Sequence, residues 1–257
     1  MKILLVNDDG IHAPGLHALH DALCELGEVT VVAPALEQSG VGLSITYLHP
    51  LMVHKEQRDG EHFGWAVHGS PADCVKLGML EFCENPPDLV VSGINSGSNV
   101  GINVLYSGTV AGAIEGAFFG VTSVAVSLSM ETLPDYPRAA KIAGNLIRDL
   151  LATDPPTGSL WNLNLPKTTP EGPKGVKVVR MGVKRIDDTI EKRLDPRGRP
   201  YYWSGLDPAR NHAQIPETDN YEVSKGFVTL TPLHFDLSET TLMEQAAKIS
   251  WSIDSET

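Results

Sequence analysis

The stretch KILLVNDDG, residues 2–10, decides how this chain begins to fold. Its apolar run has the length of a buried strand and stops at two adjacent carboxylates, Asp8 and Asp9, followed by Gly10. Neighbouring side chains of a strand point to opposite faces, so both aspartates can serve one site only if the strand ends before them. Gly10 and the following Pro14 favour that end, and both carboxylates can then turn toward one point above the sheet.

Two interpretations of this acidic pair remain open at this point. Adjacent carboxylates repel each other unless a cation lies between them or one of them is protonated. Carboxylate oxygens suit Mg2+, Mn2+ or Ca2+ better than softer metals, so the first interpretation is a metal site. In the second, one aspartate caps the following helix and the other is solvated, because Asp is a favoured N-cap residue.

Strand and helix patterns alternate through the first half of the chain. The predicted strands span 2–7, 28–34, 88–95 and 122–129, and the predicted helices span 14–27, 71–82, 108–120 and 136–152. Strands that are apolar on both faces and separated by helices indicate a parallel sheet covered on both sides. The expected fold class is therefore α/β, with a Rossmann-like, mostly parallel sheet. In such sheets, ligands bind at the carboxyl edge.

The alternation is interrupted twice. Residues 36–70 combine a Gly- and Ser-rich loop with alternating segments that predict a hairpin inserted after the second strand. After residue 157, strand-like segments separated by Pro- and Gly-rich loops predict a β-rich extension. We therefore expect a core domain, residues 1–157, followed by this extension and a C-terminal arm, residues 158–257.

Composition narrows the classes of function. The formal net charge of -12 argues against a protein that coats nucleic acid, because that binding depends on Lys and Arg at the phosphates. No apolar run reaches membrane-spanning length. The three cysteines contain no CxxC pair, so neither a disulfide framework nor a thiolate zinc site is indicated. We expect a cytoplasmic protein without a stable nucleic-acid or membrane partner.

A second polar cluster, SGINSGSNVG at residues 92–101, follows the third predicted strand of the parallel set. Asn95 would emerge at the same carboxyl edge, where its amide oxygen can bind a hard cation without adding charge. Gly93, Gly97 and Gly101 let the backbone approach a ligand closely, although their spacing does not match the GxGxxG dinucleotide motif. The alternative is a tight loop with no ligand.

A third cluster, YSGTVAGAIEG, puts Ser107, Gly108 and Thr109 at the start of a predicted helix. Free amides and the helix dipole favour an anion such as phosphate there, although Ser and Thr are also ordinary helix caps. Ser39, in the loop after the second strand, could add a hydroxyl to a metal shell, or it could be a loop serine. A cation site and a phosphate site would share one edge of the sheet.

Two further features have open interpretations. Residues 174–199 hold nine Lys or Arg against four acids, which suits a solvated arm, a subunit contact, or a positive field near an anionic substrate. His68 and His234 are candidates for the rim of the site. None of the histidines has HExxH spacing, so the sequence contains no zincin motif.

Four stretches together carry a resemblance to a known family: VNDDGIHAPGL, APALEQSGVG with GSPADCV after it, SGINSGSNVG, and YSGTVAGAIEG. They closely resemble the SurE family of survival proteins, metal-dependent nucleotidases that hydrolyse phosphate monoesters. TPLHFDL, near the C-terminus, resembles the last strand of that family. The resemblance implies that Asp8, Asp9, Ser39 and Asn95 bind one divalent cation per subunit, with Mg2+ or Mn2+ expected.

The resemblance also implies assembly and substrates. The β-rich extension would be exchanged between the subunits of a homodimer, which assembles further into a tetramer in some members. Nucleoside 5'- and 3'-monophosphates would be hydrolysed to nucleoside and phosphate, and short polyphosphate is an additional substrate for some members. Which base and which position this chain prefers stays open.

The residues suggest a mechanism within this frame. Ser107, Gly108 and Thr109 would hold the phosphate oxygens, and Asn99 would hydrogen-bond the transition state. A metal-bound water would attack in line, or Asp8 or Asp9 would act as general base or as a covalent nucleophile. The sequence does not choose among these routes.

Two rival functions are compatible with an acidic pair after the first strand. A phosphoacceptor receiver needs an aspartate at the end of the third strand and a lysine at the end of the fifth. Here Ser92–Asn95 and Ser127–Ser129 stand at comparable strand ends. A nucleotide-binding sensor would keep the site without the chemistry.

Overall fold

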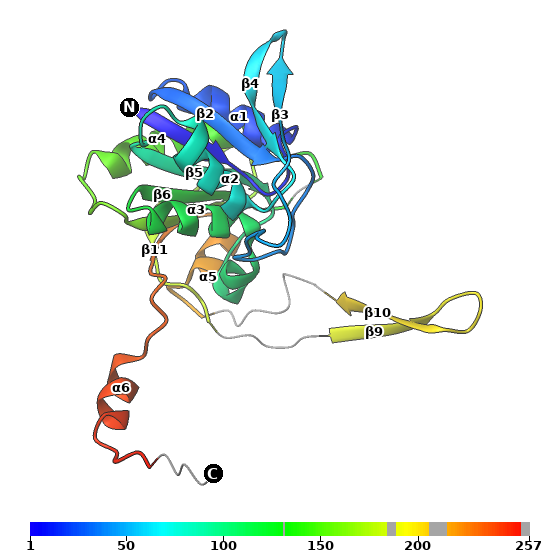
Figure 1. The fold of residues 1–257 in the computed structure, drawn as a ribbon, viewed down its shortest axis with the longest axis vertical. Coiled ribbons are helices and arrows are strands. Elements are labelled where there is room, and N and C mark those ends of the chain that lie inside the picture. The colour runs from blue at the N-terminus through cyan, green and yellow to red at the C-terminus, as the bar shows by residue number, and fades with distance from the viewer. Residues whose placement is uncertain (131, 184–188, 206–214, 253–257) are drawn as a thin grey trace.

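The computed structural model describes residues 1–130, 132–183, 189–205 and 215–252, and its core is a large sheet between two layers of helices (Figure 1). Within these ranges the sheet has nine strands in the spatial order β3-β4-β2-β1-β5-β6-β7-β11-β8. They are β1 (Lys2–Val6), β2 (Glu28–Pro34), β3 (Val53–Arg58), β4 (Glu61–Val67), β5 (Leu89–Ser96), β6 (Thr122–Leu128), β7 (Leu160–Leu165), β8 (Val176–Val178) and β11 (Val228–Leu233). Neighbouring strands from β4 to β7 run parallel.

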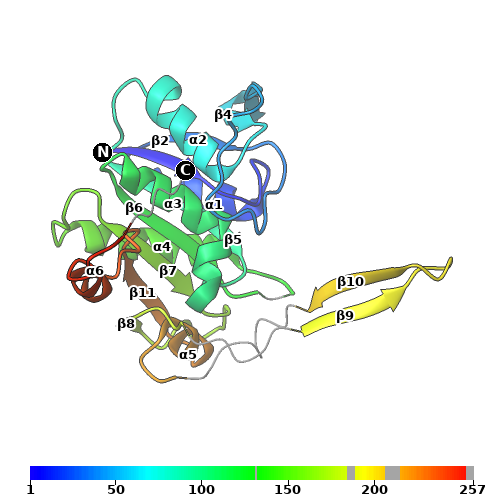
Figure 2. The ribbon, with the colours of Figure 1, turned by 60° about the horizontal axis from the view of Figure 1, so that its bottom comes forward.

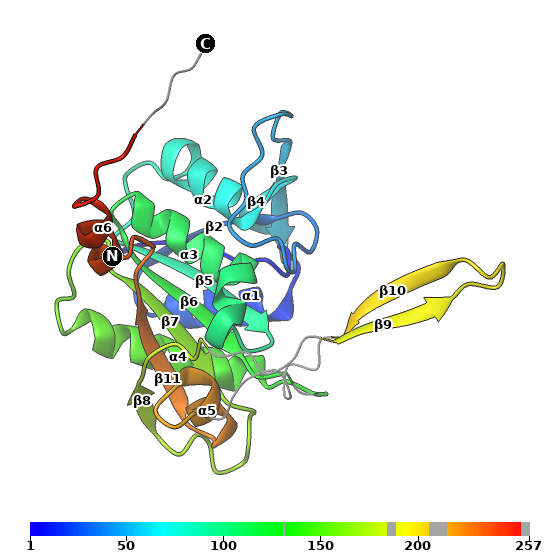
Figure 3. The ribbon, with the colours of Figure 1, turned by 90° about the horizontal axis from the view of Figure 1, so that it is seen from below.

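Helices cover both faces of this sheet. The helical elements are α1 (Pro14–Leu23), α2 (Pro71–Leu77), η1 (Gly78–Phe82), η2 (Gly101–Tyr106), α3 (Gly108–Phe118), α4 (Tyr136–Leu151), α5 (Asp219–Ser224) and α6 (Thr240–Ala246). α1 packs on α4 over one face, and α2 packs on α3 over the other (Figure 3). The fold is therefore α/β with a mostly parallel sheet and helices on both faces, as the sequence predicted.

β1 shows why its sequence is apolar at every position. Ile3 and Leu5 belong to the core cluster that contains α1 and α4, whereas Leu4 and Val6 belong to the cluster under α2. All four are at most 2% exposed. A strand covered on both faces buries side chains of both parities, so its pattern does not alternate.

The four strands predicted in the first half of the chain correspond to β1, β2, β5 and β6, and the predicted hairpin corresponds to β3 and β4. β4 pairs with β2 in parallel, so the hairpin extends the main sheet at one edge. The helix predicted over residues 71–82 differs in form, because α2 continues as the π-helical turn η1. Gly78 packs so closely on β1 that an added Cβ would lie 2.6 Å from Leu4 Cδ1.

The strands of the predicted β-rich extension belong to two different sheets. β7 pairs with β6 in parallel, β11 pairs antiparallel with β7, and β8 joins β11, so these three continue the core sheet. β9 (Thr189–Leu194) and β10 (Pro200–Gly205) instead form a separate antiparallel hairpin that projects from the body (Figures 1 and 2). Exchange of this region between subunits stays a prediction.

The last described helix, α6, has no buried residue and extends away from the sheet (Figure 1). Its exposed apolar side chains include Leu242 and Met243, each 60% exposed.

No helix in the described part of the chain is both long enough and apolar enough to cross a membrane.

Candidate metal and phosphate site at the carboxyl edge of the sheet

The acidic pair lies just beyond the end of β1. The strand stops at Val6, and the side-chain amide of Asn7 then donates a hydrogen bond of 2.9 Å to the carbonyl oxygen of Gly10. Gly10 has a φ of 98°, which a residue with a Cβ rarely adopts, so the chain leaves the pleat here. The prediction that the strand ends before Asp8 and Asp9 is confirmed.

Other chain segments meet this pair at the same edge. The backbone amide of Ser96, at the end of β5, donates to Asp9 Oδ2 over 3.1 Å. The amide of Gln38 donates to the Asp8 carbonyl over 2.7 Å, which brings the loop that carries Ser39 to the site. The Thr109 hydroxyl, at the start of α3, donates to Asp8 Oδ1 over 2.6 Å. The three polar clusters and the Ser39 loop therefore converge, as the carboxyl-edge rule predicts.

The electrostatics of the pair are unusual for aspartates. Asp8 is 4% exposed, and burial, reinforced by the charge of Asp9, raises its pKa to about 6 although the Thr109 hydroxyl opposes the shift. Burial also raises the pKa of Asp9, and the charge of Glu37 adds to this effect. Within the described ranges, neither carboxylate forms an ion pair with a Lys or Arg.

The remaining polar atoms fit a hard cation. Asn95 donates its amide NH2 to the Gly97 carbonyl over 2.7 Å, which leaves the amide oxygen as a possible ligand. Ser39 donates its proton to Glu37 Oε1 over 2.6 Å, so its oxygen lone pairs stay available. No group of three His, Cys, Asp or Glu suited to a metal occurs in the described residues. A cation here would therefore need amide and hydroxyl oxygens beside the two carboxylates, a donor set that suits Mg2+ or Mn2+.

At the start of α3, more of the polar groups have hydrogen-bond partners within the protein than the sequence indicated. Ser107 accepts the Val110 amide over 3.1 Å and is thus a real helix cap, one of the two interpretations left open. The Thr109 hydroxyl donates to Asp8. An added Cβ on Gly108 would lie 2.8 Å from Asp8 Cβ. The Asp8 carboxylate itself therefore lies at this helix N-terminus, and the Ser107 hydroxyl proton and the Gly108 amide remain for a phosphate.

Asn99 points inward. It is 9% exposed, and its amide nitrogen donates to the hydroxyls of Ser127, over 2.9 Å, and Thr109, over 3.2 Å. Its backbone is held by Asn162 and Asn164 of β7. The sequence motifs did not indicate these two asparagines, although two Asn at alternate positions of an otherwise apolar strand are a detectable signal. Nor did the motifs indicate Glu37, which accepts the Ser39 hydroxyl proton.

The two rim histidines lie in different places. His68 lies near His54 of β3, with ring centroids 5.6 Å apart. His234 lies on an apolar hollow of about 510 Å3 that Ser107 also lines, and its ring stacks on Phe235. His234 thus shares a cavity with Ser107 of the predicted phosphate segment.

Several cations of the basic segment have acidic partners nearby. Lys177 pairs with Glu222 over 2.7 Å, Arg193 pairs with Glu191, and Arg199 pairs with Asp195. Two more of its cations, Lys184 and Arg185, lie outside the described residues. The Arg193 and Arg199 side chains are exposed, as in a solvated arm, whereas Lys177 pairs with Glu222, whose side chain is only 6% exposed.

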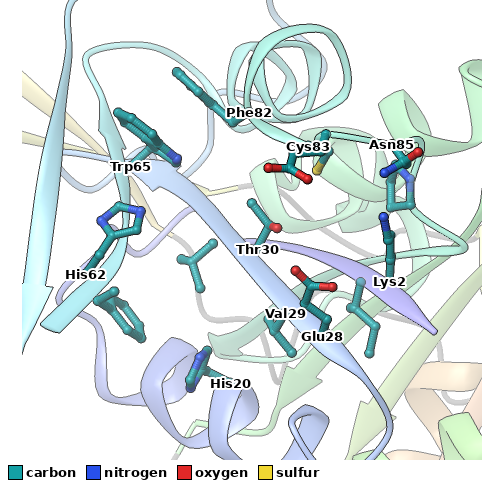
Figure 4. Close-up of a pocket in the computed structure, with 15 residues that line it drawn as sticks. Lys2, His20, Glu28, Val29, Thr30, His62, Trp65, Phe82, Cys83 and Asn85 are labelled. Atoms are coloured by element: carbon teal, nitrogen blue, oxygen red, sulfur yellow. The ribbon is translucent and has the colours of Figure 1, made fainter.

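A second hollow, of about 380 Å3, lies at the amino edge of the sheet (Figure 4). Its walls include Lys2 and Glu28, which begin β1 and β2. Trp65 and Phe82 stack on each other with ring centroids 4.3 Å apart, so they leave no slot between them for a ligand. Burial raises the pKa of the Cys83 thiol, which disfavours a reactive thiolate.

The fold and the site together define a class: an α/β protein with an oxygen-rich polar site at the carboxyl edge of a parallel sheet. A family model described as "Survival protein SurE" matches residues 3–188. The chain therefore belongs to the SurE family. The resemblance seen in the sequence motifs is confirmed.

Individual relatives agree over almost the whole chain. The protein is 56% identical over 247 residues to a 5'-nucleotidase SurE of Rhodopirellula baltica, covering 95% of this chain and 97% of that protein. It is 44% identical to a 5'-nucleotidase SurE of Pelotomaculum thermopropionicum, covering 97% and 95% of the two chains. The crystal structure of the Sure protein from Aquifex aeolicus superposes with a TM-score of 0.83 at 40% identity, covering 95% of this chain and 98% of that one.

Proposed function

We propose that this protein is a divalent-metal-dependent 5'-nucleotidase that hydrolyses nucleoside 5'-monophosphates to nucleoside and phosphate. The observation that carries the proposal is the Asp8–Asp9 pair, which is buried or half-buried and has no cationic side chain paired with it among the described residues. The names of the relatives in Rhodopirellula and Pelotomaculum support the reaction and the substrate class.

Four side chains would hold the cation: Asp8, Asp9, Ser39 and Asn95. Their oxygens suit one Mg2+ or Mn2+ per subunit, which when bound supplies Lewis-acid polarisation and lowers the pKa of a coordinated water. Without it, the two carboxylates would repel an anionic phosphate ester as well as each other.

The start of α3 would receive the phosphate. Ser107 can donate its hydroxyl proton and Gly108 its amide, while Thr109 contributes to the same segment from its position against Asp8. Asp9, the more exposed acid of the pair, is the better placed to accept a proton from an attacking water. Asn99 completes this set of site residues. The stereochemical course at phosphorus separates the two routes, because direct attack by water inverts the configuration and a covalent aspartyl-phosphate route retains it.

We further propose a homodimer or tetramer, in the cytoplasm, that also accepts 3'-monophosphates and short polyphosphate. Exposed aromatic side chains on the β9–β10 hairpin, Tyr202 and Trp203, support an assembly that covers them. Cys24, Cys74 and Cys83 are all free thiols, which agrees with a reducing compartment. Light scattering of the purified full-length protein measures the assembly.

Phosphate release from AMP in the presence of Mn2+ or Mg2+ tests the proposal. A panel of 5'- and 3'-nucleotides, sugar phosphates and polyphosphate, run against several cations, defines the substrate class. The expected result is cation-dependent release from 5'-monophosphates that EDTA abolishes. Binding of AMP without release, under every cation, would instead identify the sensor function.

A further inference from the structure

Two asparagines of β7 hold the loop that follows β5. Asn162 and Asn164 donate their side-chain amides to the carbonyl oxygen of Asn99, over 2.8 and 3.1 Å. Asn164 also accepts the backbone amide of Asn99 over 2.9 Å. Both asparagines are completely buried, in a strand that otherwise packs in the apolar core. Buried amides cost stability unless they are hydrogen-bonded, and the bonds to Asn99 satisfy both NH2 groups and Asn164 Oδ1, whereas Asn162 Oδ1 has no hydrogen-bond partner among the described residues.

Asn99 passes this constraint on to the site. Its amide nitrogen donates to Ser127 Oγ and to Thr109 Oγ1, over 2.9 and 3.2 Å. Thr109 is fully buried, and its hydroxyl donates to Asp8 Oδ1 over 2.6 Å. The chain of contacts therefore runs from β7 through the loop after β5 and the start of α3 to the end of β1.

The direction of these hydrogen bonds is fixed by chemistry. A threonine hydroxyl has one proton, and an ionised carboxylate can only accept. Because Asn99 donates to the oxygen of Thr109, the single proton of that hydroxyl is left for Asp8. A hydrogen bond to a charged acceptor is stronger than one between neutral groups, so this last contact holds the carboxylate most firmly.

We propose that Thr109 and Asn99 are positioning residues for Asp8, with Asn162 and Asn164 as the clamp that fixes Asn99. The inference rests on the proposed function, in which Asp8 binds the cation. Neither Thr109 nor Asn99 needs to touch the substrate through its side chain. The Thr109 hydroxyl proton is donated to Asp8, and both side-chain amide protons of Asn99 have acceptors. Residues that orient metal ligands in this way set the affinity for the metal.

The test compares Thr109→Val with Thr109→Ser. Valine keeps the shape and removes the hydroxyl, whereas serine keeps the hydroxyl. The readout is the dissociation constant for Mn2+ alone, measured by calorimetry on the full-length protein without nucleotide. We expect about 10- to 100-fold weaker binding in Thr109→Val and binding within about threefold of wild type in Thr109→Ser.

Thr231→Val is the matched control. Thr231 lies on β11, is 1% exposed, and its hydroxyl has no hydrogen-bond partner in the described part of the chain. The substitution is chemically the same, so its Mn2+ affinity should equal that of wild type. Thermal unfolding of the metal-free variants identifies any that fail to fold, and in that case Asn162→Leu replaces Thr109→Val, with an expected loss of about 3- to 10-fold because Asn164 remains.

The outcomes separate the inference from the proposed function. A folded Thr109→Val protein that binds Mn2+ as wild type does would overturn the positioning role. A wild-type protein that binds Mn2+ but releases no phosphate from AMP would overturn the proposed reaction, while the ratio of the Mn2+ constants would still decide the positioning role. Loss of AMP turnover in Asn99→Ala with unchanged Mn2+ affinity would assign Asn99 to the substrate instead.

Discussion

Asp8 lies just after the first strand and Asp21 lies on the first helix, but the surroundings of the two aspartates are opposite. Asp21 lies on α1 and receives two hydrogen bonds, of 2.6 and 2.8 Å, from the Arg58 guanidinium, which lowers its pKa to about 2. Asp8 lies buried beside Asp9, and its pKa is raised to about 6. Among the described residues, a guanidinium pairs with the acid on the surface, and no Lys or Arg pairs with the acids at the carboxyl edge. That difference points to a cation taken from solution.

Two other buried aspartates show that burial alone does not create such a site. Asp73 is 1% exposed and accepts the amides of Thr46 and Ser70. Asp219 is completely buried and accepts the amides of Gly101 and Gly182. These carboxylates are structural, because single acids can be satisfied by backbone donors. The pair at the end of β1 differs because a second negative charge is adjacent.

Replacing each acid by its amide should affect phosphatase activity very differently at the two positions. Asp9→Asn removes a proposed ligand and is expected to lower phosphate release from AMP with Mn2+ at least about 10³-fold. Asp21→Asn, on the surface, should keep activity within about threefold. Comparable losses in both variants would show that the acidic pair has no special role.

Gly108 tests whether the close approach of α3 to Asp8 matters. In Gly108→Ala the new Cβ would lie 2.8 Å from Asp8 Cβ and 2.9 Å from Oδ2, so the carboxylate must move. We expect kcat/KM for AMP to fall about 10- to 100-fold. Gly144→Ala, in α4, is the control, because its Cβ would meet atoms only at 3.7 Å. Equal activity of the two variants would count against a fixed Asp8.

The stability of the cation-free protein should depend on pH through Asp8. Its pKa is about 6 in the folded protein against an ordinary 3.8, so the folded state holds the proton more tightly. The free energy of unfolding should therefore fall as pH rises from about 4 to above 6. At pH 8 in EDTA, Asp8→Asn should raise that free energy by up to about 3 kcal/mol, measured by urea unfolding. A destabilised Asp8→Asn protein would contradict this sign.

Asp21 should show a smaller effect of the opposite sign. Its pKa is lowered to about 2, so its contribution is complete above an ordinary pKa of 3.8 and disappears as pH falls toward 2. Because the side chain is more than half exposed, we expect Asp21→Asn to lower the unfolding free energy at pH 7 by no more than about 1 kcal/mol. An increase in stability at pH 7 would contradict the assignment to Arg58.

The features that could be predicted from the sequence are those encoded locally. The apolar run of β1, the break at Gly10 and the helix after Pro14 sufficed to place Asp8 and Asp9 outside the strand. The carboxyl-edge rule then grouped them with Asn95 from β5. The family motifs supplied Ser39, which no local pattern distinguishes from a loop serine.

The remaining features depend on contacts between distant segments. Asn162 lies 63 positions from Asn99 in the sequence, and the hydroxyl of Thr109 lies 101 positions from Asp8. The pattern of β7 predicts a strand, but not that it pairs with β6 beneath the loop of Asn99. For the same reason the predicted extension could not be divided into core strands and a projecting hairpin.

The central claim is a cation site at the end of β1. Calorimetric titration of the cation-free protein with Mn2+ tests it most directly. Wild type and Asp21→Asn should each bind one Mn2+ per chain with the same dissociation constant. Asp8→Asn and Asp9→Asn should bind at least about 100-fold more weakly, because each removes a carboxylate from the proposed shell. Binding to these two variants that matches wild type would contradict a cation site at the end of β1.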